Sequence, residues 1–204
     1  MRPSPSHAHG LRRRTLMALL PAVLAACASR APRAPRVSLP MLRLSPAAAG
    51  LTLAAVQRLS VRRLDGAGVV SNAPSVQTVD LLLSLGAQRL RLAGFSLGQR
   101  VLTLDWDGST LDVKRHPLLP AEVDTDRMLR DLCLVYWPAD AVRASLPAGW
   151  TLEHDGAGRR LLKADRIVID IRYTGALDAA SNQVELTNRA ESYSLSIESQ
   201  LQSP

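Results

Sequence analysis

Apolar and polar residues alternate with a period close to two over residues 51–114. Leu90 and Leu92, for example, fall between Arg89 and Arg91 and therefore lie on one face of an extended segment. Asp107-Gly108 is a strong hairpin signal between two such segments. The pattern predicts an antiparallel meander of strands at residues 55–64, 76–85, 88–93, 100–106 and 109–114.

The periodicity then becomes helical. Met128, Leu129, Leu132 and Val135 recur at helical spacing, and Asp124 or Thr125 can cap a helix that we expect at residues 126–137. Pro138 ends this helix and opens a shorter one at 138–146. Alternation then resumes, which predicts strands at 150–153, 160–163, 167–173, 183–187 and 193–197. Strands, helices and strands again, without strand–helix alternation, predict an α+β domain built on a mainly antiparallel sheet.

The N-terminal segment has the organisation of a secretory signal. Three arginines, Arg12 to Arg14, precede an apolar run at residues 16–23, which is too short to span a bilayer as a helix. Leu24-Ala25-Ala26-Cys27 looks like a bacterial lipobox, in which the cysteine is acylated after the preceding peptide is removed. The alternative is an ordinary signal peptide with a chance cysteine. We expect a signal peptide at 1–26, a linker rich in Pro and Arg at 27–50, one domain at 51–199 and a tail at 200–204.

Charge and cysteine content narrow the function classes. The formal net charge is +7, but residues 1–26 carry four arginines and no acids, so the mature chain has 21 − 18 = +3. No basic stripe is interleaved with aromatic residues, which argues against nucleic-acid binding. If Cys27 carries lipid, Cys133 is left alone and cannot form an intramolecular disulfide. Its apolar neighbours at 132–135 predict a buried, unreactive thiol.

Three patches of the sequence resemble a known fold. They are residues 89–92 with the turn Phe95-Ser96-Leu97-Gly98-Gln99, the helical segment 126–150, and the strand-rich segments 161–173 and 184–197. Their order resembles the outer-membrane lipoprotein receptor LolB over roughly residues 51–199. More narrowly, the chain looks like an uncharacterised family of predicted bacterial lipoproteins with that fold. The resemblance implies a half-open antiparallel barrel, LolA/LolB-like, with two short helices as a lid over an apolar cavity for acyl chains.

The resemblance also implies a function. The receptor takes lipoproteins from a periplasmic carrier and places them in the outer membrane, and some relatives in the narrower family are encoded beside aryl polyene lipid synthesis and export genes. The turn here reads Phe-Ser-Leu-Gly where the receptor has Asn-Pro-Leu-Gly, and this departure bears on cargo identity. Ala28 rather than Asp follows Cys27, which in those families favours the outer membrane. A partner would be a periplasmic carrier or exporter.

Several residues are candidates for a site. Apolar Phe95 and Leu97 at a turn tip predict contact with a membrane, a cargo chain or a partner, and the resemblance favours the membrane for Leu97. Residues that we expect to line a cavity or pack in the core under the helices are Trp106, Leu129, Leu132, Trp137 and Trp150.

Gly94-x-Ser96-x-Gly98 matches the pattern of a hydrolase nucleophile elbow, but that motif needs a helix after it, and residues 100–106 read as a strand. His116 and His154 have no partners at ligand spacing. We therefore expect no enzyme, catalytic residue, cofactor or metal.

Two functions stay open at this stage. The first is a lipid-anchored module in the outer membrane, facing the periplasm, that binds or transfers acyl chains or lipidic cargo. The second is a structural or assembly lipoprotein whose curved sheet binds a protein partner. A wide cavity lined by Leu and Val would favour the first, and a filled barrel with an exposed apolar edge would favour the second.

Overall fold

A computed structural model describes residues 37–65, 76–119 and 123–202 of the chain. The strands form one ten-stranded antiparallel sheet in the order β5-β4-β3-β2-β1-β10-β9-β8-β7-β6. Their bounds are β1 Leu53–Arg63, β2 Gln77–Leu85, β3 Leu90–Ser96, β4 Gln99–Trp106, β5 Leu111–Arg115, β6 Trp150–His154, β7 Gly158–Lys163, β8 Arg166–Thr174, β9 Ser181–Asn188 and β10 Tyr193–Leu201. The signal peptide and Cys27 lie outside the described residues.

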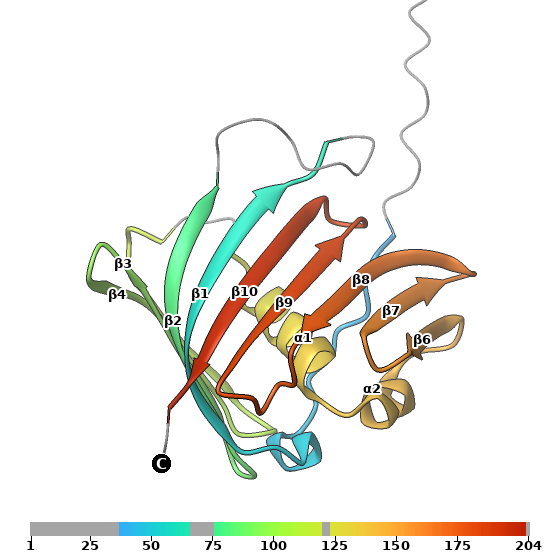
Figure 1. Cartoon of the computed structure of the whole chain (residues 1–204), viewed down its shortest axis with the longest axis horizontal. Coiled ribbons are helices and arrows are strands. Elements are labelled where there is room, and N and C mark those ends of the chain that lie inside the picture. The colour runs from blue at the N-terminus through green and yellow to red at the C-terminus, as the bar shows by residue number, and fades with distance from the viewer. Residues whose placement is uncertain (1–36, 66–75, 120–122, 203–204) are drawn as a thin grey trace, which may run out of the picture. The chain divides into compact units, whose positions relative to one another are not determined.

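The sheet consists of two five-stranded meanders joined side by side. β1 pairs with β10 from Ala55–Leu201 to Arg63–Tyr193, which makes one continuous sheet. β5 and β6 are its two edges, so the sheet is not closed. Helices α1 (Thr125–Tyr136) and α2 (Ala139–Ser145) connect these edges. α1 therefore lies against the curved face of the sheet (Figure 1).

The predicted α+β class and all ten expected strands are confirmed, with ends that shift by a few residues. Alternation sets the two faces, as the sequence suggested. Along β1, Leu53, Ala55 and Gln57 are buried toward the helix side and the residues between them are exposed. The largest shift concerns β10, which was expected to end at residue 197 and continues to Leu201; β3 likewise continues through Gly94 and Phe95 to Ser96.

Helix α1 begins and ends where its local sequence dictates. The Asp124 carboxylate accepts hydrogen bonds from the backbone N–H groups of Asp126 (3.0 Å) and Arg127 (3.2 Å), as an N-cap does. The helix ends at Tyr136, ahead of Pro138, whose steric requirement keeps the preceding residue extended. No helix among the described residues has the length and apolar character needed to cross a bilayer.

The expected linker at 27–50 extends too far, because its described part is packed on the domain. Leu42 and Ala49 are buried, and residues 46–49 form a short 3-10 helix, η1 (Pro46–Ala49). The indole N–H groups of Trp106 and Trp137 donate to the carbonyls of Leu44 and Ser45, each at 2.8 Å. Proline prevents a ladder in this segment but does not prevent packing, so these two buried donors fix it to the core.

The expected tail at 200–204 also begins too early. Gln200 and Leu201 belong to β10, and Ala55 of β1 pairs with Leu201. β10 continues to Leu201 because β1 extends far enough to pair with it, with Ala55 opposite Leu201.

Candidate functional site

A cavity of about 740 Å³ lies between α1 and the curved face of the sheet. On α1 and its N-cap, the lining residues are Asp124, Arg127, Met128, Asp131, Leu132 and Val135, a single face at helical spacing. Most of the sheet side is aliphatic: Leu59, Val61, Val79, Leu81, Leu92, Val101, Leu102, Leu186, Leu195 and Ile197. The cavity thus follows about 17 Å of helix at 1.5 Å per residue.

One end of the cavity is closed. Gln57 lines it and is 2% exposed, whereas Ala55 and Leu53, further along β1, are core residues outside the lining. The Gln57 side-chain N–H group donates to the Tyr136 hydroxyl at 2.6 Å and to the Ser199 hydroxyl at 2.9 Å. These neutral hydrogen bonds satisfy the amide N–H group at a depth where an unpaired polar group would cost stability.

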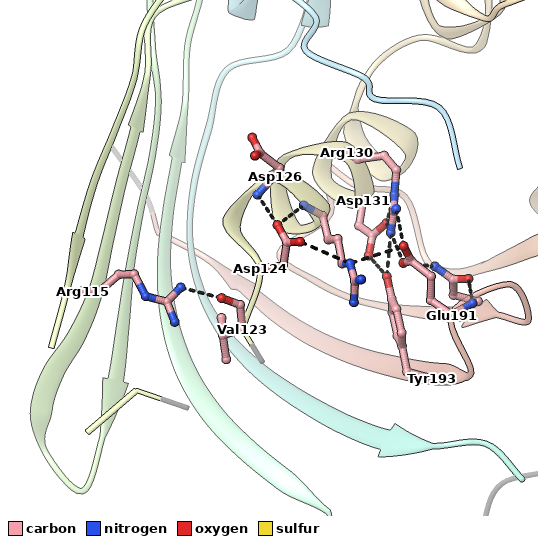
Figure 2. A network of polar contacts seen from close by, with 10 residues as sticks. Arg115, Val123, Asp124, Asp126, Arg130, Asp131, Glu191 and Tyr193 are labelled. Atoms are coloured by element: carbon pink, nitrogen blue, oxygen red, sulfur yellow. Dashed lines mark hydrogen bonds and ion pairs between the residues drawn. The ribbon is translucent and has the colours of Figure 1, made fainter. Parts of the chain in front are cut away.

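The other end carries a network of charged side chains, shown in Figure 2. Arg130, which is 4% exposed, donates to both Glu191 oxygens at 3.2 and 2.8 Å and to Asp131 at 3.0 Å. The Tyr193 hydroxyl accepts from Arg130 at 2.9 Å and donates to Asp131 in a short hydrogen bond. Helix α1 is thereby tied to the β9–β10 hairpin, which holds the helix N-terminal half over the sheet.

For Asp131 and Arg130, burial and ion pairing shift the pKa in opposite directions. Burial raises the pKa of Asp131, although Arg130 and Tyr193 oppose the shift. Burial disfavours the Arg130 charge, but the hydrogen bond to Glu191 and the charge of Asp131 outweigh it and raise the Arg130 pKa. Arg130 therefore stays charged and compensates two carboxylates that the fold removes from water.

The C-terminal half of α1 is held by a second set of contacts. Arg159 in β7 donates to the carbonyls of Leu134 (2.7 Å) and Trp137 (2.6 Å), and the Tyr173 hydroxyl donates to Val135 at 3.0 Å. These carbonyls lie in the last turn, where helices leave carbonyls unpaired and where a cation suits the helix dipole. Neither Arg159 nor the Arg130 network was predicted from the sequence.

The predicted cavity or core residues divide into two groups. Leu132 lines the cavity, whereas Leu129, Trp106 and Trp137 are fully buried core residues outside the lining. Trp150 is half-buried at the start of β6, with the Lys163 ammonium 5.1 Å from its ring centroid. The cavity is therefore lined by aliphatic side chains of the sheet rather than by the tryptophans.

The predicted turn tip is a tight hairpin. Ser96 pairs with Gln99, so Leu97 and Gly98 form a two-residue loop, with φ of 51° and 75°. Positive φ at both positions is the type I′ arrangement. Leu97 is 102% exposed and projects from the tip. Phe95 is half-buried, with the Arg100 guanidinium 5.6 Å from its ring centroid.

The other candidate chemistry falls on local turns. Gly94-x-Ser96-x-Gly98 leads into strand β4, so it lacks the helix that a nucleophile elbow requires. His116 lies in the loop after β5 and His154 is the last residue of β6, and both are exposed; the His116 ring accepts from the Leu118 N–H, and His154 contacts a backbone carbonyl. Among the residues that the structure describes, no group of three or more His, Cys, Asp or Glu could hold a metal ion.

The fold and the cavity define the protein as an α+β domain in which one helix covers an apolar cavity on an open antiparallel sheet. Residues 54–201 match the family described as protein of unknown function (DUF3261). The chain belongs to this DUF3261 family. A search of curated proteins found no match.

Proposed function

We propose that this protein is a lipid-anchored lipoprotein of the outer membrane, facing the periplasm, that binds or transfers an acyl chain or a lipidic cargo. The observation that carries the proposal is the cavity of about 740 Å³ with its aliphatic lining. This volume lies within the range of about 300–1,000 Å³ of small-ligand sites. An apolar cavity that is not filled by the protein's own side chains is suited to an apolar guest.

The apolar lining favours binding of an acyl chain by a free energy that grows with the length of that acyl chain. Each methylene that moves from water into the cavity gains about 0.8 kcal/mol. Transfer then follows differences in affinity, because cargo leaves a poorer cavity for a better one and finally for the membrane. No covalent chemistry is needed for this step.

The resemblance to the LolA/LolB half-open barrel is supported by the arrangement of the elements. The sheet is open between β5 and β6, and α1, one of the two helices that join these edges, covers the cavity as a lid would. Cargo of the receptor type would come from a periplasmic carrier, and cargo of the aryl polyene type from an exporter.

Leu97 is the proposed point of contact with the membrane. Its exposed side chain lies at the β3–β4 tip, and Leu118, which is 70% exposed, follows β5 toward the same end of the sheet. The His116 N–H donates to Val101, so the chain after β5 runs toward the start of β4. Two exposed leucines at one end of a sheet are suited to a nonaqueous surface.

The alternative, an assembly lipoprotein that binds a protein through the sheet, has less support. The described edge strand β5 carries exposed Asp112, Lys114 and Arg115, and charged side chains discourage strand pairing. The cavity instead favours a small apolar ligand.

The test is mass spectrometry of lipids that co-purify with the soluble Cys27→Ala protein. We expect acyl-chain lipids in stoichiometric amounts. Lipid-free protein that also fails to take up added lipid would reject the proposal.

A further inference from the structure

Arg63 lies at the end of the cavity opposite Gln57, here called the open end, with its side chain on the lined face. It is the last residue of β1 and pairs with Tyr193 of β10. Gln57, Leu59 and Val61 precede it at spacing of two, and all four line the cavity. Arg63 is exposed, and no carboxylate of the described residues lies within ion-pair distance of it.

The carboxylates at this end already have donors. Asp124 caps α1 and pairs with Arg127 at 3.3 Å. Glu191 accepts from Arg130 and Asn188 and pairs with Arg127 at 3.3 Å. Asp131 accepts from Arg130 and Tyr193.

At the open end, the group that no described carboxylate pairs with is therefore a hydrogen-bond donor, the Arg63 guanidinium. A guanidinium offers five N–H groups in a fork that matches a carboxylate or a phosphate. The N-terminus of the twelve-residue helix α1 lies at the same end and adds its positive dipole.

The closed end has the opposite character. Its polar groups are the neutral side chains of Gln57, Ser199 and Tyr136, which bond to one another. An ionised group at this depth would lose its hydration without gaining a counter-charge, which is unfavourable. A charged head group therefore belongs at the Arg63 end, and an apolar tail at the Gln57 end.

We propose that the cavity takes a single-chain amphiphile, tail first, and that Arg63 binds its anionic head group through carboxylate or phosphate oxygens. This inference rests on the proposed function, because it names the chemical class of ligand for the same cavity.

The test compares amphiphiles that share one twelve-carbon chain. The assay measures displacement of a fluorescent fatty acid from the Cys27→Ala protein by four probes, each below its micelle concentration. The probes are dodecanoate, dodecyl phosphate, dodecanol and dodecyltrimethylammonium. We expect the anions to bind about tenfold more tightly than dodecanol, since hydrogen bonds to a charged group are the stronger kind. The better of the two anions distinguishes a carboxylate from a phosphate ligand.

Arg63→Gln should weaken binding of the preferred anion about tenfold and leave dodecanol within about twofold. Arg62→Gln is the matched control, because Arg62 is the preceding residue of β1 and therefore faces the other side of the sheet. It should bind every probe as the parent protein does, and thermal melting checks that both variants are folded.

Equal binding of all four probes, or equal loss in the Arg62 and Arg63 variants, would overturn the inference and leave the proposed function standing. Failure of every probe to bind would overturn both.

Discussion

Leu97 occupies a backbone conformation that its side chain does not favour. Its φ of 51° lies in the left-handed region, which costs a residue other than Gly, Asn or Asp about 1–2 kcal/mol. Type I′ hairpins prefer Asn-Gly, and this chain has Leu-Gly with the leucine fully exposed. The strain is not repaid by packing, which favours a role for Leu97 outside the fold.

We predict that Leu97→Asn stabilises the protein by about 1 kcal/mol and impairs cargo delivery to liposomes. Urea denaturation and a transfer assay measure the two effects. Leu97→Glu keeps the strain and adds a charge, so it should fold normally and fail in delivery. Delivery at the parent rate by both variants would reject the membrane-contact role.

Cys133 is a buried thiol in the helix that covers the cavity. It is 0% exposed, and burial raises its pKa from 9.0 to about 12. The raised pKa means that the thiolate is disfavoured in the fold. Stability from this group is complete below pH 9 and is lost as pH rises toward 12.

We predict that Cys133→Ala costs about 1 kcal/mol at pH 7 through a small cavity. The parent protein should lose stability above pH 9 more steeply than the variant, by at most about 1.4 kcal/mol per pH unit. Denaturant titrations from pH 7 to 10 compare the two. Rapid modification of the native protein by a thiol reagent at pH 7 would show instead that Cys133 is accessible.

Helix α1 is the element on which the cavity depends, and it is held at its middle and at its C-terminal end. Arg130 joins its middle to Glu191, and Arg159 caps its last carbonyls. Loss of either contact leaves buried polar groups unpaired.

We predict that Arg159→Met lowers the free energy of unfolding by about 2–3 kcal/mol, because it leaves two buried carbonyls without donors. Arg160→Gln is the control, since Arg160 is exposed on the opposite face and its nearest carboxylate, on Asp170, is 3.7 Å away. It should change stability by less than about 0.5 kcal/mol. A loss for Arg159→Met no larger than the control would show that the helix end does not need this cap.

The elements were predictable because each is encoded locally. Alternation around Leu90 and Leu92, the Asp124 cap and the stop at Pro138 depend on near neighbours in the chain. The clamps are not local, since Arg130 and Glu191 lie 61 residues apart. Adjacent charges at Arg130 and Asp131 within an otherwise apolar run were the available signal, but they did not identify a partner.

At the scale of the whole molecule, the sheet order could not be read from the sequence. Pairing of β1 with β10 joins the two halves of the domain, and the pattern within either strand does not specify it. The aliphatic cavity follows from that pairing, and its expectation came from the resemblance rather than from periodicity. The packing of Leu42 and Ala49 was likewise not predicted, because the prolines around them indicated a linker.

Anchoring also belongs to the whole molecule. We predict that Cys27 is the acylated N-terminus of the mature protein and that Cys27→Ala moves the protein from the membrane fraction to the soluble fraction. Several acyl chains hold a protein far more firmly than one, at about 0.8 kcal/mol per buried methylene. A Cys27→Ala protein that remains in the membrane fraction would refute lipid anchoring at this residue.

The central claim is that the space under α1 holds an acyl chain. Calorimetric titration of palmitate into the Cys27→Ala protein, with Leu59→Trp and Val56→Trp added to that background, tests it most directly. Leu59 lines the cavity, whereas Val56 faces outward from the same strand and is 38% exposed. We predict binding of one palmitate per chain, a loss of at least about tenfold for Leu59→Trp, and a change within about twofold for Val56→Trp. Absence of binding to the parent protein, or unchanged binding to a folded Leu59→Trp variant, would contradict the account.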